Sequence, residues 1–147
     1  MSPDAMRISG SCHCGNIAFE LDWSPEPAEI PARACTCTFC TRHGGVWTAC
    51  PGGSLRIRVR DLARMSDYAF GTGTAAFHVC SACGVVPVVT SRIDGRLYAV
   101  VNVNTFDGVD PSLLRHSPSN LEGETEADRL ARRARNWIGD VAFEETR

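Results

Sequence analysis

The sequence of 147 residues lacks lysine, and its basic residues are all arginine. Fifteen basic and 17 acidic residues give a formal net charge of -2, so the chain has no overall basic field. Without such a field, binding to nucleic acid or to an anionic membrane has no electrostatic support, and we expect neither partner. We interpret the exclusive use of arginine as the composition bias of a bacterial genome rich in G and C.

Long hydrophobic runs are also missing. No stretch approaches the roughly 20 apolar residues of a membrane-spanning helix, and residues 1–10 lack the apolar run of a secretory signal. We therefore expect a cytoplasmic protein. Hydrophobic residues make up 44% of the chain and charged residues 22%, close to the averages for globular proteins, which predicts a single folded domain over residues 1–147.

Alternation of apolar and polar residues predicts a fold made mostly of β-strands. The clearest case runs from Ile17 to Trp23, where every second residue is apolar. Asp94-Gly95 predicts a tight hairpin turn, and Pro87 predicts an edge strand or a bulge. Arginines alternate with apolar residues after Leu55, and we interpret them as a solvated strand face. Further strands are expected at residues 29–34, 55–59, 76–79, 85–93 and 96–103.

Only the C-terminal region predicts a substantial helix, from about Thr125 to Ile138. Leu130, Ala134 and Trp137 recur at helical spacing, so this face is expected to pack on a sheet, with the arginines of the segment in solvent. Thr125 begins a sequence that resembles a capping box, and a glycine follows Ile138 as a stop signal. The predicted architecture is mainly β with one C-terminal helix.

Eight cysteines are the most informative feature of the sequence. In a reducing compartment, so many cysteines favour metal binding over disulfides, and two cysteines in a CxC turn cannot bridge each other without strain. Seven of them form three groups and one stands alone: Cys12 and Cys14; Cys35, Cys37 and Cys40; Cys80 and Cys83; and Cys50.

The first and third groups predict a closed zinc site. Zinc prefers four tetrahedral ligands, and a CxC or CxxC turn supplies two of them on one side. Cys12 and Cys14 therefore need a second pair, and Cys80 and Cys83 provide one. A glycine follows each pair and suits the tight turn that directs backbone N–H groups at sulfur. We expect a structural zinc ion with four thiolate ligands.

The middle group predicts a different site, because Cys35, Cys37 and Cys40 place three thiolates within six residues. Three ligands leave one coordination position open, as in catalytic zinc sites. Other partitions remain open from the spacing alone, since Cys35 and Cys37 could pair with the Cys80 group. Cys50 could close the second site as a fourth ligand, although a buried free thiol is the favoured interpretation.

The histidines give weaker signals. His43 follows the middle cysteines closely, so it is either a hydrogen-bond donor or general acid–base beside them, or an exposed loop residue. His78 lies in a strand pattern and is expected to be packed or at the surface rather than a metal ligand. His116 carries no signal by itself.

Taken together, these motifs resemble the glutathione-dependent formaldehyde-activating enzyme family, which includes relatives of centromere protein V. The resemblance implies a β-tent fold of antiparallel sheets around zinc sites. The matching segments are residues 10–19, 35–44, 77–84 and 103–107. The resemblance also implies one structural zinc ion and one labile or catalytic zinc ion, held respectively by Cys12, Cys14, Cys80 and Cys83 and by Cys35, Cys37 and Cys40.

The resemblance further implies an activity, that of a carbon–sulfur lyase. Such an enzyme makes or breaks an S-hydroxymethyl adduct between a small thiol such as glutathione and an aldehyde such as formaldehyde, with Cys35, Cys37 and Cys40 as the catalytic group. Arg42 or Arg56 is a candidate to neutralise a substrate carboxylate. Two other hypotheses stay open: a non-catalytic binding module stabilised by zinc, and a sensor of thiol or metal stress.

Overall fold

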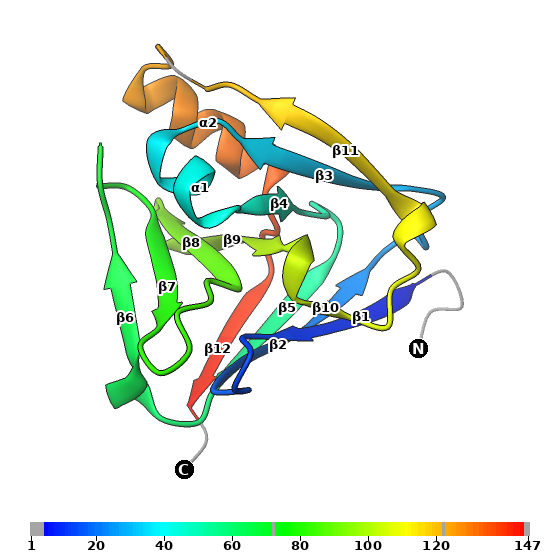
Figure 1. The fold of residues 1–147 in the computed structure, drawn as a ribbon. Coiled ribbons are helices and arrows are strands. Elements are labelled where there is room, and N and C mark those ends of the chain that lie inside the picture. Colours follow the sequence, from blue (N-terminus) through cyan, green and yellow to red (C-terminus); the bar gives the residue numbers. More distant parts are fainter. Residues whose placement is uncertain (1–4, 72, 122, 146–147) are drawn as a thin grey trace.

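The computed structural model describes residues 5–71, 73–121 and 123–145, so part of the N-terminal segment considered above, residues 1–4, lies outside the described residues. Twelve strands and two α-helices follow one another in the described chain, and the strands form two sheets (Figure 1). No helix of these segments is long and apolar enough to cross a membrane.

The five-stranded sheet contains the strand with the strict alternation. Its strands lie in the order β10-β1-β2-β5-β12, all antiparallel to their neighbours except β12, which runs parallel to β5. β2 buries every second residue from Ile17 to Trp23, as predicted. The strands are β1 (Met6–Ser11), β2 (Ile17–Trp23), β5 (Ser54–Val59), β10 (Phe106–Asp107) and β12 (Val141–Glu145).

The arginine face of β5 lies in solvent, which confirms its interpretation. Leu55, Ile57 and Val59 point into the core, whereas Arg56 and Arg58 lie on the outside of the sheet. There both guanidinium groups pair with carboxylates of the neighbouring strands, at distances of 3.3 Å to Glu144 and to Glu20.

The seven-stranded sheet has the order β11-β3-β4-β9-β8-β7-β6 and is antiparallel except for β11, which runs parallel to β3. Asp94 and Gly95 form the predicted hairpin turn between β8 and β9, with φ angles of 51° and 81°. The strands are β3 (Ile30–Cys35), β4 (Val46–Thr48), β6 (Met65–Tyr68), β7 (Ala76–Cys80), β8 (Val88–Ile93), β9 (Arg96–Asn102) and β11 (Leu114–Ser119).

The expectation that Pro87 marks an edge strand was wrong. β8 lies between β7 and β9 and is therefore a central strand, and it begins only at Val88. Pro87 precedes the ladder, where its missing N–H costs no strand hydrogen bond, and its carbonyl oxygen accepts a hydrogen bond from the Asn102 N–H at 2.8 Å.

The two sheets form three sides of a tent-like fold (Figure 1). The seven-stranded sheet supplies two of these sides, one with β3 and β11 and the other with β6 to β9, and the five-stranded sheet forms the third. The core fills the space between them and contains the inward residues of β2 and β5 with those of β8 and β9. The fold is therefore mainly β and tent-like, as expected, although β11 and β12 add a parallel pair to each sheet.

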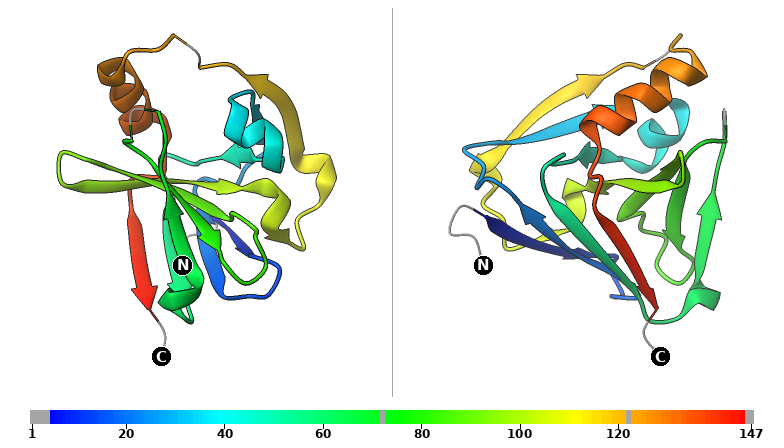
Figure 2. Two further views of the ribbon diagram at one scale, coloured as in Figure 1. Left: turned by 60° about the vertical axis from the view of Figure 1, so that its left-hand side comes forward. Right: turned by 180° about the vertical axis from the view of Figure 1, so that it is seen from behind.

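The C-terminal helix is present but differs from the prediction in length and orientation. α2 (Glu126–Asn136) has Thr125 as its N-cap, whose side chain accepts a hydrogen bond from the Asp128 N–H. The helix ends before Trp137, which is extended, and Ile138 pairs with Ala99 of β9 as an isolated bridge. β3 and β11 pair with each other and run side by side toward this helix in the right-hand view of Figure 2.

The predicted apolar face of α2 packs only in part, through Trp137, which lies against the core just after the helix ends. Ala134 is exposed, Leu130 and Trp137 are only partly buried, and the buried residue of the helix is Arg133. A polar face of the helix lines the cavity beneath it, where Arg133 donates hydrogen bonds to Thr74 and Ser91.

Candidate metal centre

The first cysteine cluster forms where two similar turns meet. Cys12 and Cys14 lie in the turn between β1 and β2, while Cys80 ends β7 and Cys83 lies in the turn after it. Both turns are closed by a backbone hydrogen bond from the first cysteine to the fifth residue beyond it, Cys12 N–H to Ile17 at 2.8 Å and Cys80 N–H to Val85 at 3.0 Å. The glycine after each pair has a φ near +84°, a conformation that other residues rarely adopt.

The positions of these four sulfur atoms fit a zinc ion. All four lie within 4.8 Å of one another, and the Sγ atom of Cys14 is 3.8 Å from that of Cys12 and 3.5 Å from that of Cys80. Tetrahedral zinc with bonds of about 2.3 Å would separate two sulfur ligands by about 3.8 Å. A disulfide would bring them to about 2.05 Å, and all eight cysteines are free thiols.

Protonation differs within this cluster. Burial raises the pKa of Cys12 to about 12. Burial also opposes ionisation of Cys83, but hydrogen bonds from the backbone N–H groups of Val85 and Cys14, together with those from the Cys80 and Cys12 thiols, outweigh it and lower the pKa of Cys83 to about 6. The turn that holds Cys83 therefore stabilises a thiolate, the form of cysteine that binds metal.

The second cluster is assembled by β3 and the short helix that follows it, α1 (Thr38–His43). Cys35 ends the strand, Cys37 is the N-cap of the helix and Cys40 lies in the helix, with all three sulfur atoms within 4.8 Å of one another. The Cys37 Sγ atom accepts the Cys40 N–H at 3.3 Å, and the indole N–H of Trp47 donates to the Cys40 Sγ atom at 3.4 Å. Gly44 ends the helix with a φ of 75°.

Hydrogen bonding between the thiols polarises this cluster. The Cys40 thiol donates to the Cys35 sulfur, which lowers the pKa of Cys35 to about 5 and raises the pKa of Cys40 above its ordinary value. The positive charge of Arg132 also favours the Cys35 thiolate. Three soft sulfur donors in this arrangement fit zinc with one coordination position left for another ligand.

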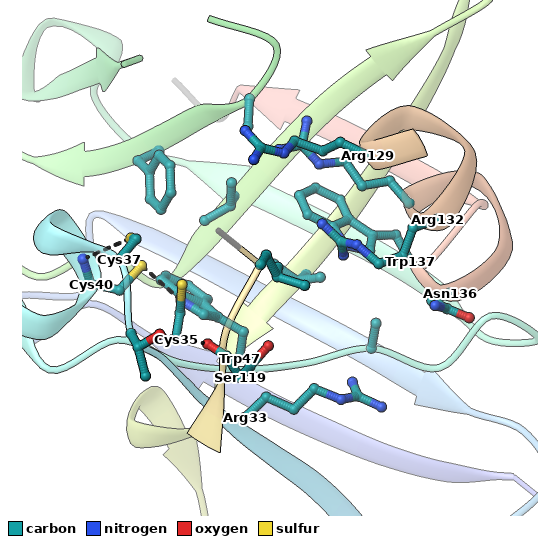
Figure 3. Close-up of a pocket in the computed structure, with 18 of the residues that line it drawn as sticks. Arg33, Cys35, Cys37, Cys40, Trp47, Ser119, Arg129, Arg132, Asn136 and Trp137 are labelled. Carbon is teal, nitrogen blue, oxygen red and sulfur yellow. Dashed lines mark hydrogen bonds between the residues drawn. The ribbon is translucent and has the colours of Figure 1, made fainter. Parts of the chain in front are cut away.

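This second cluster opens into a cavity of about 590 Å³, within the size range of small-molecule sites. Cys35, Cys37 and Cys40 lie on one side, and Arg132 and Trp137 lie on the other (Figure 3). Between them the wall is largely aromatic and aliphatic, formed by Trp47, Phe70, Ala75, Phe77, Val89 and Val100. Within the described part of the chain, the lining contains four arginines and no Asp or Glu.

Two of these arginines, Arg129 and Arg132, come from α2 and are tied to the segment before it. Their guanidinium groups share the carboxylate of Glu124, with the Nε atoms at 3.3 and 2.9 Å from its oxygens. The hydrogen bond from Arg132 is the main cause that holds the pKa of Glu124 below its ordinary value. One carboxylate between two guanidinium groups leaves a net positive charge at this edge of the cavity.

The remaining cysteine belongs to neither cluster. Cys50 is buried and donates a hydrogen bond from its Sγ atom to the carbonyl oxygen of Ser24 at 3.4 Å, which agrees with a buried free thiol. It lies outside the cavity lining and outside both groups of sulfur atoms. The structure therefore does not bring Cys50 to the three-cysteine cluster, and it keeps Cys35 and Cys37 apart from the Cys80 group.

His43, His78 and His116 lie in different surroundings. His43 packs against Phe39, with ring centroids 4.4 Å apart, and burial lowers the pKa of His43. His78 is a packed residue, as predicted, because its ring nitrogens bond Asp67 and Thr90, each at 2.7 Å. The ring of His116 is exposed on β11.

The arginine candidates named from the sequence do not reach the cavity. Arg42 is exposed on α1, and Arg56 pairs with Glu144 on the outside of the five-stranded sheet. The cavity instead contains arginines that we had expected in solvent. A signal for them was present in the sequence, since the polar residues that line the cavity from α2 recur at helical spacing: Arg129, Arg132, Arg133 and Asn136.

Comparisons with known proteins agree with the geometry. A crystal structure of a Rhodobacter sphaeroides protein, a structural-genomics target, is similar to this chain with 34% sequence identity and a TM-score of 0.55. The alignment covers 71% of this chain and 92% of the other. The sequence model of one family matches residues 7–119, which include both cysteine clusters but end before α2. By this match, the chain belongs to the glutathione-dependent formaldehyde-activating enzyme family.

Proposed function

We propose that this chain is a zinc-dependent carbon–sulfur lyase that makes or breaks an S-hydroxymethyl adduct between a small thiol and an aldehyde. One observation carries the proposal: a cluster of three cysteines, too few to complete a tetrahedral site, opens into a cavity large enough for a small thiol. The family match supports the choice of glutathione and formaldehyde, or a related pair, as substrates.

Each cysteine cluster has its own role in this proposal. Cys12, Cys14, Cys80 and Cys83 would hold a structural zinc ion, because four thiols complete its tetrahedral coordination. The three-cysteine cluster, which consists of Cys35, Cys37 and Cys40, would hold a second zinc ion. Zinc bound there supplies an exchangeable position that can bind a thiolate or polarise a carbonyl oxygen.

The reaction is an addition and needs no oxidant or reductant. The sulfur of the thiol forms a bond to the aldehyde carbon, the π bond of the carbonyl group breaks, and the thiol proton ends on the carbonyl oxygen. The reverse reaction breaks the same carbon–sulfur bond. Holding both reactants in one cavity contributes to the rate because it replaces a bimolecular encounter by a bound pair.

The protein residues around the cluster orient and shield the reactants. The Trp47 N–H holds the Cys40 sulfur in place, which fixes one corner of the three-cysteine cluster. Trp47 and Phe77 pack edge to face with centroids 5.9 Å apart and form an apolar wall beside the sulfur atoms. Such a wall excludes water from the reacting groups, and the charge of Arg132 attracts an anionic thiol toward them.

Zinc analysis with an exchange assay tests the proposal. We expect inductively coupled plasma measurements to find one tightly held zinc ion per chain and a second that a mild chelator removes. Proton NMR should show that the zinc-loaded protein accelerates exchange between free thiol, formaldehyde and the hydroxymethyl adduct above the spontaneous rate. Cys40→Ser should abolish this acceleration.

Cys50→Ser is the matched control, because it changes a buried cysteine that lies in neither cluster. It should keep both zinc ions and the exchange activity. Zinc-loaded protein that accelerates exchange with no tested pair of thiol and aldehyde would contradict the proposed function. A second zinc ion that is always present and slow to exchange would then favour the binding-module hypothesis.

A further inference from the structure

A row of apolar side chains crosses three neighbouring strands on the cavity side of the seven-stranded sheet. Phe77 of β7 pairs with Val89 of β8, and Val89 pairs with Val100 of β9, so the three side chains lie next to one another on one face of the sheet. All three residues line the cavity, and we call them the apolar floor. Val89 is 2% exposed and Val100 8%, so the floor is well shielded from bulk water.

Aromatic rings connect the apolar floor to the three-cysteine cluster. Trp47 pairs with Asn102, two residues beyond the floor residue of β9, and therefore lies on the same face of the sheet. Its ring packs edge to face with Phe77 at 5.9 Å, and its N–H donates to the Sγ atom of Cys40 at 3.4 Å (Figure 3). Phe70 stacks on Phe77, with ring centroids 5.3 Å apart. A molecule bound at the three-cysteine cluster therefore has apolar surface directly beside it.

Formaldehyde makes little use of such a surface. A water molecule takes about 30 Å³ of liquid volume, so formaldehyde, with two heavy atoms, needs about 60 Å³. The cavity has a volume of about 590 Å³. Formaldehyde has one carbon atom, which reacts, and no further apolar group that could cover the floor. The gain in free energy from removing this apolar surface from water requires a larger apolar ligand.

A polar thiol such as glutathione does not cover the floor either. Its peptide and carboxylate groups would leave water for side chains that have no hydrogen-bonding atoms, which costs free energy. The opposite side of the cavity suits such groups better, because Arg132 and Asn136 of α2 line it. In the proposed reaction, the aldehyde is the other reactant and is left to occupy the floor.

We propose that the apolar floor binds the hydrocarbon chain of the aldehyde, and that the protein prefers aldehydes with several carbons to short ones. The inference rests on the proposed function, since it assigns the second reactant to the same cavity. Bond formation is unchanged: the thiol sulfur adds to the aldehyde carbon, the carbonyl π bond breaks and the thiol proton goes to the oxygen. Phe77, Val89 and Val100 are specificity residues and take no part in bond formation.

A series of linear aldehydes tests the inference. Propanal and hexanal have carbonyl groups of similar reactivity and differ by three methylene groups. Exchange with 2-mercaptoethanol would be measured by proton NMR on the zinc-loaded protein. Hexanal should have a kcat/KM about tenfold higher or more, because each buried methylene group contributes a factor of about two to four. Equal values, after subtraction of the spontaneous rates, would overturn the inference.

The length of the thiol provides the control for general hydrophobicity. With propanal as the aldehyde, 6-mercaptohexan-1-ol in place of 2-mercaptoethanol adds four methylene groups on the thiol side. This change should alter kcat/KM by less than about twofold, because the floor is reserved for the aldehyde. If a longer thiol gained as much as a longer aldehyde, the floor would not distinguish the two reactants and the inference would fail.

Variants locate the site. Ala75 is partly buried and lines the cavity two residues before Phe77, so Ala75→Leu should fill space beside the floor. It should reduce the preference for hexanal over propanal to about twofold or less. Ala76→Leu is the matched control, because it makes the same change at a partly buried residue outside the cavity lining, and it should keep the preference. Equal loss in both variants would overturn the inference.

Val100→Thr keeps the test decisive if Ala75→Leu fails to fold. Threonine has nearly the shape of valine but places a hydroxyl in the floor, and that hydroxyl would lose water when an alkyl chain binds. The preference for hexanal should fall by about threefold or more, with little change for propanal. An unchanged preference would remove the floor from the binding site and overturn the inference. Melting temperatures and zinc content should be compared for every variant.

Binding without chemistry separates this inference from the proposed function. NMR titration of the zinc-loaded protein with 1-propanol and 1-hexanol uses probes that cannot react with a thiol. Hexanol should bind about tenfold more tightly, and Ala75→Leu should remove that advantage. Such binding by a protein without exchange activity would contradict the lyase assignment and leave the apolar site standing. Exchange activity without any preference for chain length would overturn the inference and leave the proposed function standing.

Discussion

Thr48→Val should stabilise the protein, although it changes a completely buried residue of a central strand. Thr48 is 0% exposed, and its hydroxyl has no hydrogen-bond partner within the described chain. Burial of an unpaired hydroxyl costs about 1–3 kcal/mol, and valine fills nearly the same volume while keeping the branched shape that suits a strand. We expect the free energy of unfolding to rise by about 1 kcal/mol, and the melting temperature by about 2–4 °C.

Thr90→Val is the matched control, because it makes the same chemical change in β8. This strand belongs to the same sheet as β4 and is separated from it by β9. Thr90 is 6% exposed, and its Oγ1 atom bonds the Nε2 atom of His78 at 2.7 Å. Valine would leave that buried nitrogen unpaired, which costs about 1–3 kcal/mol. The two variants should therefore move stability in opposite directions and differ by at least about 2 kcal/mol.

Urea unfolding followed by tryptophan fluorescence and circular dichroism would measure both free energies. Zinc must be saturating in each sample, since bound metal stabilises the folded state by mass action. A Thr48→Val variant that loses as much stability as Thr90→Val would refute the reasoning, because it would show that the hydroxyl of Thr48 has a partner in the fold.

Three further predictions concern metal, charge and packing. Cys83→Ser should give unfolded or aggregated protein, because structural zinc binding is worth roughly 10–16 kcal/mol, whereas Cys40→Ser should stay folded and lose one zinc ion. Equal unfolding of both variants in circular dichroism melts would mean that both sites are structural. Glu124→Gln should lower stability at pH 7, since Arg132 holds the pKa of Glu124 low in the folded state. The stability that the Glu124 carboxylate contributes is complete above its pKa in the unfolded chain and disappears as the pH falls through its lower pKa in the folded protein. The melting temperatures of the wild type and Glu124→Gln should therefore converge in acid, and a difference that persists there would contradict the prediction. Trp137→Ala should cost about 1–2 kcal/mol in urea unfolding, below the 3–5 kcal/mol of a fully buried ring, and a larger loss would show that the ring belongs to the core.

Strands with one buried face were predictable from the sequence. The segment from Ile17 to Trp23 must place its apolar side chains on one side, and the structure buries that side in the core. β11 gave no such signal, because its residues 114–119 include a proline and are mostly polar and exposed. It joins the sheet through backbone pairing with β3, and backbone pairing leaves little trace in side-chain pattern.

The orientation of α2 was not predictable from apolar spacing. Apolar periodicity indicates which face is buried only when the helix packs directly on an apolar layer. Here the helix covers a cavity, so Arg133 lies inside and Ala134 outside. Stacking on Trp137 and hydrogen bonds to Thr74 and Ser91 hold the guanidinium there.

The sequence by itself determined which cysteines are close neighbours within each candidate metal site. Cys12 and Cys14, like Cys80 and Cys83, lie in a glycine turn that presents their sulfur atoms together, whatever the rest of the chain does. Only the tertiary structure decided that the Cys12 turn meets the Cys80 turn, and that the three-cysteine cluster faces the arginines of α2. Such contacts join residues 66 or more positions apart and depend on how the two sheets close, a choice that no short segment makes alone.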